Sequence, residues 1–136
     1  MKKDIPNLKV EDIAIVIAPP DETDMDTELW DAFLINFKEE PIEGVLIVSK
    51  GYGEDEDGEM RRTSTLRHFI ERVGALEMIK IEPISTKLLW MSHEYWVSFT
   101  CQGHMYDKKY VFVVGSIEPT NFIMIPFLDR KGVMIR

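Results

Sequence analysis

The sequence contains one cysteine, Cys101, and no apolar run long enough to cross a membrane. A single cysteine excludes an internal disulfide and a zinc site made of cysteines alone, and it is typical of a reducing compartment. The apolar run IAIVIA near the N-terminus has six residues and follows Glu11 and Asp12, so we expect no secretion signal. A membrane helix needs about 20 consecutive apolar residues. These absences predict a cytoplasmic protein that does not enter a membrane.

Sequence motifs for nucleotide, calcium and nucleophile sites are also missing. No G-x-x-x-x-G-K-[ST] loop occurs, and SKGYGEDEDG breaks the G-x-G-x-x-G pattern because residue 56 is a glutamate. The same segment fails as a calcium loop, because Gly53 and Ser64 would occupy two positions that require acids. The possible soft metal ligands show no paired short spacing; they are His68, His93, Cys101 and His104. The sequence therefore predicts no metal, no other cofactor and no identifiable catalytic residue, and it favours a protein that is not an enzyme.

The composition is that of an ordinary folded domain. The chain has 136 residues, of which 45% are hydrophobic and 29% are charged. This length is sufficient for one hydrophobic core without disulfides or metals. We therefore expect residues 1–136 to form a single domain.

Charge is distributed unevenly along the chain. Residues 1–60 carry 17 acidic and 5 basic side chains, a net charge of −12, whereas residues 61–136 carry 7 acidic and 11 basic side chains, a net charge of +4. Such asymmetry can attract a partner, or it can hold two halves of one fold together. The overall charge of −8 disfavours nucleic acid, so RNA binding by the basic half is only a third hypothesis.

Alternating apolar residues predict strands along most of the chain. A strand is expected at residues 10–18, followed by a loop in DETDMDTELWD. WDAFLINFKEE and EGVLIVSKGYG are predicted to pair as a hairpin through Glu40-Pro41-Ile42, and the first is expected to be central because both of its faces are apolar. EMRRTS would add a third meander strand. ALEMIKIEP predicts another strand, EYWVSFTCQGHMYDKKYVFVVG a second hairpin, and FIMIPF and GVMI two short strands that pair at a sheet edge.

One segment has helical periodicity. Four apolar residues fall at i, i+3, i+4 and i+7, namely Leu66, Phe69, Ile70 and Val73. They predict a helix over residues 65–73, with Thr63 or Ser64 as its N-cap and Gly74 at its end. STKLLWMS predicts a shorter helix capped by Ser85. The predicted fold class is α+β: a mainly antiparallel sheet of about six strands, with one well-formed helix and one short helix packed on it.

The segment EDEDGEMRRTSTLR, residues 54–67, is a candidate anion site. The start of the predicted helix would expose unpaired N–H groups, and arginine side chains match the oxygen atoms of phosphate or carboxylate. The candidate anion-binding residues are Lys50, Tyr52, Arg61, Arg62, Thr63, Ser64 and Thr65. In the alternative interpretation, the loop's own acids at residues 54–59 neutralise the two arginines.

A second candidate is a protein interface around Trp96. Core packing accounts for most of the three tryptophans and eight methionines of the chain. Trp96, however, shares one face of its predicted strand with Ser98 and Thr100, and a large aromatic side chain on a polar face is typical of an interface. We therefore expect a homodimer formed through that face of the sheet.

The runs EGVLIVSKGYG, STLRHFIE, EYWVSF and YDKKYVF together resemble a family of small uncharacterised bacterial proteins of about this length. The resemblance spans nearly the whole chain, and it implies no activity. The first functional hypothesis is a non-enzymatic protein-interaction or regulatory module of the bacterial cytoplasm. The alternative is a small-ligand-binding protein or enzyme that holds a phosphate or carboxylate near Arg61 and Arg62. An RNA-associated protein is the third.

Overall fold

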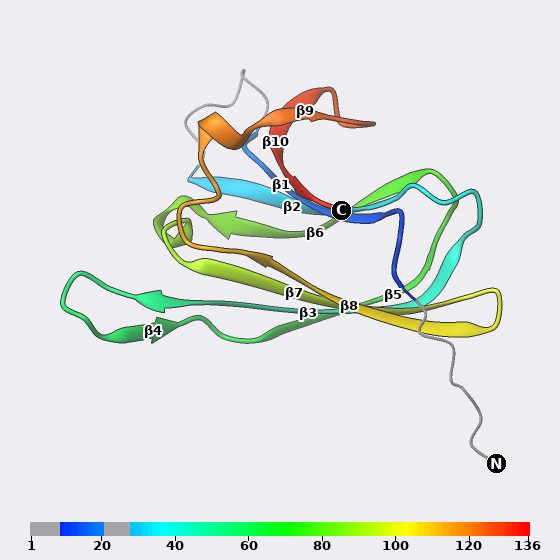
Figure 1. The fold of residues 1–136 in the computed structure, drawn as a ribbon, viewed down its shortest axis with the longest axis horizontal. Coiled ribbons are helices and arrows are strands. Elements are labelled where there is room, and N and C mark those ends of the chain that lie inside the picture. The colour runs from blue at the N-terminus through cyan, green and yellow to red at the C-terminus, as the bar shows by residue number, and fades with distance from the viewer. Residues whose placement is uncertain (1–8, 21–27) are drawn as a thin grey trace, which may run out of the picture.

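The computed structural model describes residues 9–20 and 28–136, which form ten strands in two antiparallel sheets that face each other (Figure 1). Sheet A has the strand order β6-β2-β1-β10-β9. Its strands are β1 (Ile13–Ala18), β2 (Leu29–Asn36), β6 (Glu77–Ser85), β9 (Ile123–Ile125) and β10 (Arg130–Ile135). Sheet B has the order β4-β3-β7-β8, and β5 also pairs with β3. Its strands are β3 (Ile42–Glu54), β4 (Met60–Arg62), β5 (Leu66–Val73), β7 (Ser92–Cys101) and β8 (His104–Phe112).

The predicted α+β class is wrong, because the fold is a β-sandwich. Within the described residues the helical elements are two 3-10 turns of three residues each, η2 (Thr86–Leu88) and η3 (Pro119–Asn121). The predicted second helix therefore shrinks to η2, although the capping prediction is confirmed: the side chain of Ser85 accepts a hydrogen bond from the backbone N–H of Lys87 at 3.3 Å. The predicted main helix at residues 65–73 is the edge strand β5.

Strand β3 explains why this segment does not form a helix. The 13 residues of β3 pair with β7 along one edge, so the other edge would leave N–H and C=O groups unpaired without β5 and β4. A helix of nine residues, as predicted over residues 65–73, is marginal by itself, whereas a strand here satisfies the backbone of both segments. Phe69, Ile70 and Val73 are also aromatic or β-branched residues that suit a strand.

The two predicted hairpins had different outcomes. β7 and β8 pair antiparallel through a tight turn at Gln102 and Gly103, whose φ angles of 49° and 78° are typical of a two-residue hairpin turn. The hairpin predicted through Glu40-Pro41-Ile42 is wrong, because β2 lies in sheet A and β3 in sheet B. The connection between them instead crosses from one sheet to the other. β2 is nevertheless central, between β1 and β6, as predicted.

Most other strand predictions are confirmed. β1 and β6 lie where the sequence placed them, β4 extends the meander beside β3, and β9 pairs with β10 at the edge of sheet A. The loop predicted within residues 21–31 falls partly outside the described residues, since residues 21–27 are not described. Its last three residues, 29–31, begin β2.

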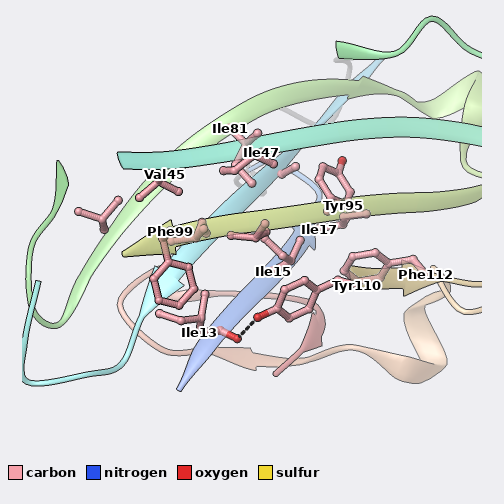
Figure 2. Packing of buried hydrophobic residues seen from close by; sticks show 14 of the residues in the cluster. Ile13, Ile15, Ile17, Val45, Ile47, Ile81, Tyr95, Phe99, Tyr110 and Phe112 are labelled. Carbon is pink, nitrogen blue, oxygen red and sulfur yellow. Dashed lines mark hydrogen bonds between the residues drawn. The ribbon is translucent and has the colours of Figure 1, made fainter. Parts of the chain in front are cut away.

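The main core fills the space between the sheets (Figure 2). The inward residues Ile13, Ile15 and Ile17 of β1 pack against side chains of β3, β7 and β8. Tyr110 is buried with them, and its hydroxyl donates a hydrogen bond to the carbonyl oxygen of Ile13 at 2.7 Å. This bond gives the tyrosine hydroxyl a partner inside the core and links sheet B to sheet A.

Buried Asn36 joins two of the four connections that cross between the sheets. Its side-chain nitrogen donates to the carbonyl oxygens of Glu40 and Gly74, each at 3.0 Å, and its side-chain oxygen accepts from the backbone N–H of Lys38 at 2.9 Å. Glu40 belongs to the β2–β3 connection, and Gly74 to the β5–β6 connection. One side chain thus forms hydrogen bonds with backbone groups that lie between strands and therefore have no partner in either sheet.

A second apolar cluster lies on the outer face of sheet A. Its buried members are Ala14, Val16, Ala18, Phe33, Ile35 and Ile125. Ile125 comes from β9, and the C-terminal hairpin of β10 and β9 rises from β1 on the side away from sheet B (Figure 1). Gly132 allows β10 to approach β1 closely, because a Cβ atom there would lie 2.7 Å from the carbonyl oxygen of Ile17. The C-terminal hairpin therefore closes this face.

Candidate functional site

The outer face of sheet B exposes large apolar side chains. We define the outer patch as Leu46, Val48, Phe69, Trp96 and Met105. Leu46 lies opposite Phe69 of β5 in the ladder, and Val48 lies opposite Trp96 of β7. Phe69 is 68% exposed and Trp96 is 44% exposed. The patch is therefore continuous across three neighbouring strands, and Met105 adds an exposed apolar side chain farther along the same face, opposite Thr100.

A carboxylate paired with two lysines borders the outer patch. The ammonium group of Lys50 lies 3.6 Å from Oε2 of Glu94, and that of Lys109 lies 3.9 Å from Oε1. The hydroxyl of Tyr52 donates to Glu94 at 3.4 Å. Burial, together with the adjacent charge of Glu94, raises the pKa of Tyr52 above its ordinary value. Lys109 also lies over the ring of Trp96, with its nitrogen 5.3 Å from the ring centre.

Charges of both signs surround the outer patch. Besides the Glu94 cluster, Arg67 lies beside Val48 on β5, and Asp107 lies beside Ser98 on β8. The charged side chains on this face include Lys50, Arg67, Lys109, Glu94 and Asp107, together with Glu71, two residues from Phe69 on β5, and Arg62, opposite Tyr52. The face is thus close to neutral, although the whole chain carries a charge of −8.

The sequence identified part of this face. The predicted interface residues Trp96, Ser98 and Thr100 all lie on it, and the hydroxyl of Thr100 donates to the carbonyl oxygen of Glu43 at 3.2 Å. Leu46 and Phe69 were missed. Phe69 was assigned to the buried stripe of a helix that does not form, which concealed its position on the sheet surface.

Five of the seven candidate anion-binding residues line one cleft of about 340 Å³. They are Lys50, Tyr52, Arg62, Thr63 and Thr65, and Glu94 lines the same cleft. Ser64 instead lines a cavity between the sheets. The helix start that motivated this site does not exist, because residues 66–73 form β5. The cleft therefore depends on side chains alone to attract an anion.

The acidic loop neutralises Arg61, which is one of the two arginines named in the alternative interpretation. Nε of Arg61 lies 2.8 Å from Oδ2 of Asp55, and its Nη2 lies 3.5 Å from Glu59. The hydrogen bond from Arg61 holds the pKa of Asp55 below its usual value. Arg62 makes no ion pair with any residue in the described part of the chain. Arg62 is therefore the arginine that remains available to a ligand.

The remaining candidates do not converge on a chemical site. Across residues 9–20 and 28–136, no three His, Cys, Asp or Glu side chains are grouped so that they could hold a metal ion. The same residues include no helix of the length and apolarity needed to span a membrane. No model of a known protein family matches the chain, and no curated protein is similar to it. The resemblance to small bacterial proteins therefore stays a prediction.

Proposed function

We propose that this protein is a non-enzymatic interaction module that forms a symmetric homodimer through the outer face of sheet B. The observation that carries the proposal is the outer patch itself. Large exposed apolar side chains that lie together on one face are typical of protein-binding surfaces. Phe69 and Trp96 are aromatic anchors of the kind that dominate binding energy at such surfaces.

The charges around the patch favour a second copy of this chain as the partner. A symmetric dimer places the same patch on both sides, so the patch must be compatible with itself. Lys50, Arg67 and Lys109 are nearly balanced by Glu94 and Asp107, so two such faces meet without strong repulsion. A strongly acidic or strongly basic partner would not be attracted to this nearly neutral face, because it offers no surface of opposite charge.

The edge of sheet B favours contact through the face rather than through strand pairing. β8 is the edge strand beyond β7, and it carries Asp107, Lys108 and Lys109 in succession. Charged residues on an edge strand discourage pairing with another strand. The proposal places the dimer in the cytoplasm, which is supported by the single, buried cysteine, Cys101.

Sedimentation velocity at rising protein concentration tests the proposal. We expect a monomer–dimer equilibrium that Phe69→Glu weakens at least about tenfold, because the variant buries a charge in the contact. Met124→Glu is the matched control, since Met124 is exposed on β9, at the opposite sheet. Added salt should strengthen association, because two chains of net charge −8 repel each other.

Two results would overturn the proposal. Wild-type protein that stays monomeric at the highest soluble concentration removes the homodimer altogether. Equal weakening by Met124→Glu and Phe69→Glu shows that the copies meet elsewhere.

A second candidate function, capture of a small phosphate or carboxylate ligand, is supported by the cleft beside Arg62. Lys50 and Arg62 supply positive charge there, and Thr63 and Thr65 supply hydroxyl groups. Glu94 opposes it, because its carboxylate already pairs with Lys50. A thermal-shift series with phosphate and small carboxylates should then show stabilisation that Arg62→Ala removes and Arg61→Ala preserves. An equal response in wild type and Arg62→Ala excludes this site.

A further inference from the structure

A cavity of about 350 Å³ opens between the two sheets. Sheet A contributes Glu82 and Ile84 from its edge strand β6, and sheet B contributes Ser49 and Gly51 from β3. β7 adds His93 and Tyr95. The volume lies at the lower end of the roughly 300–1,000 Å³ range of small-molecule sites. The outer patch and the Glu94 cluster lie on the opposite face of sheet B, so this cavity is separate from the proposed dimer contact.

The carboxylate of Glu82 is held in this cavity by three side chains. Its Oε1 accepts a hydrogen bond from the hydroxyl of Ser49 at 2.6 Å and lies 2.7 Å from Nε2 of His68. Its Oε2 accepts from the hydroxyl of Tyr95 at 3.3 Å. The side chain of Glu82 is only 11% exposed. A carboxylate offers about four acceptor positions, so Glu82 is fixed in place yet can accept one further hydrogen bond.

His93 provides a second acceptor in the same cavity. Its Nε2 lies 2.7 Å from the carbonyl oxygen of Leu88, so Nε2 carries the proton and Nδ1 is the acceptor nitrogen. Burial lowers the pKa of His93, which keeps the ring neutral near pH 7. A Cβ atom at Gly51 would lie 3.3 Å from Nδ1. The same atom would lie 3.1 Å from Cγ2 of Thr63, so a side chain at residue 51 would crowd the acceptor nitrogen, which the glycine avoids.

The rest of the cavity wall is largely apolar and brings no free cation. Leu66, Ile84 and Leu88 supply hydrocarbon surface. Lys50 also borders the cavity, but its ammonium group is 3.6 Å from Glu94 on the outer face of the sheet. An anion would therefore meet the carboxylate of Glu82 without a compensating lysine. A positively charged group with several N–H donors fits these acceptors instead.

We infer that this cavity binds a small organic cation, a primary ammonium or guanidinium group carried on a short apolar chain. The cationic head donates hydrogen bonds to Glu82 and to Nδ1 of His93. Its hydrocarbon part lies against Leu66, Ile84 and Leu88. The inference does not depend on the proposed homodimer, since a monomer contains the whole cavity.

Isothermal titration calorimetry on the full chain tests this inference. The probes are n-butylamine, n-butanol and butyrate, which share one chain length and differ in the charge of the head group. We expect n-butylamine to bind at least about tenfold more tightly than the other two, because only its head group pairs with a carboxylate. Equal binding of all three, or no binding of n-butylamine at any soluble concentration, overturns the inference.

Two substitutions locate the site. Glu82→Gln should weaken n-butylamine binding at least tenfold, whereas Glu94→Gln, the same change on the outer face of sheet B, should leave it unchanged. Leu66→Lys is a second variant, at an exposed strand position, that keeps Glu82 and places a positive charge at the cavity mouth. It should also weaken binding, so the test stands even if Glu82→Gln fails to fold. Unchanged binding in Leu66→Lys, or an equal loss in Glu94→Gln, overturns the assignment.

Discussion

The two outer faces of the sandwich both carry apolar side chains, but residues 9–20 and 28–136 cover only one of them. On sheet A, Phe33 and Ile35 lie beneath Ile125 of the C-terminal hairpin. On sheet B, Phe69 and Trp96 are exposed. No other strand of the described part of the chain lies on the outer side of sheet B (Figure 1). A face that the chain covers contributes to folding. An uncovered apolar face of similar composition instead points to association.

Two arginine side chains also shield aromatic rings on the outer face of sheet A, and no arginine does so on sheet B among the described residues. The guanidinium group of Arg130 lies 5.2 Å from the ring centre of Phe33, and that of Arg136 lies 4.3 Å from the ring centre of Phe37. Arg130 is also held by Asp31 at 3.1 Å. On sheet B the corresponding contact is Lys109 over Trp96, with Lys109 about half exposed. The difference between the faces can be tested one residue pair at a time.

The phenylalanine pair should give the largest difference. Phe33 is 6% exposed on sheet A, whereas Phe69 is 68% exposed on sheet B. Phe33→Ala should lower the free energy of unfolding by about 3–5 kcal/mol, because it leaves a cavity under the C-terminal hairpin. Phe69→Ala should change it by less than about 0.5 kcal/mol in the monomer. Urea unfolding at low protein concentration measures both, and similar losses would contradict the comparison.

Two isoleucines of β9 test whether this strand stabilises the outer face of sheet A. Ile125 is 1% exposed and packs on sheet A, while Ile123, two residues earlier in the same strand, is 46% exposed. Ile125→Ala should cost about 2–4 kcal/mol of stability, and Ile123→Ala less than about 1 kcal/mol. If the two losses in urea unfolding are equal, β9 is not a cover but only an edge strand.

Arg130→Ala should have the next largest effect. The variant loses the contact with Phe33 and the ion pair with Asp31, both largely shielded from solvent, so we expect a loss of about 1–2 kcal/mol. The buried Nε of Arg130 has no hydrogen-bond partner among the described residues, which limits the loss. Arg136→Ala is the control, because Arg136 is half exposed and should cost less. Thermal unfolding of the two variants checks the order.

Local patterns in the sequence were sufficient to place most strands but not to assign them to sheets. The β7–β8 hairpin could be predicted because alternation and the turn at Gln102-Gly103 are adjacent in the chain. β2 and β3 were predicted to pair because they too are adjacent. Each of them instead has one partner far along the chain, β6 for β2 and β7 for β3, besides partners that are near in sequence. Alternation alone does not specify which distant strand satisfies a given edge.

The candidate sites also divide into those formed by residues near in sequence, which could be predicted, and those formed by distant residues, which could not. Trp96 could be placed on an exposed face because its neighbours Ser98 and Thr100 are local. The partners of Glu82 could not be predicted, since Ser49 lies 33 residues away and His68 lies 14 residues away. Glu82 looks like any surface glutamate in the sequence. Only the packing of one sheet on the other turns it into a buried carboxylate.

A buried and an exposed histidine of sheet B should also differ in their contribution to the pH dependence of stability. Burial lowers the pKa of His93, so below about pH 6.5 the unfolded chain binds a proton that the folded chain resists. Stability from this group is therefore lost as the pH falls, by at most about 0.8 kcal/mol between pH 8 and pH 6. His93→Gln should remove this part of the pH dependence, whereas His104→Gln, at the exposed end of β8, should leave it. Urea unfolding at the two pH values measures the change.

The smallest expected effect is that of Lys109→Ala. Lys109 contacts the ring of Trp96 and lies 3.9 Å from Glu94, as Arg130 contacts Phe33 and Asp31, but its side chain is half exposed. Water screens both interactions, and Lys50 remains beside Glu94, so the stability of the monomer should change by less than about 0.5 kcal/mol. A loss equal to that of Arg130→Ala would mean that Lys109 covers sheet B as effectively as the arginines cover sheet A. The outer patch would then need no partner to account for it.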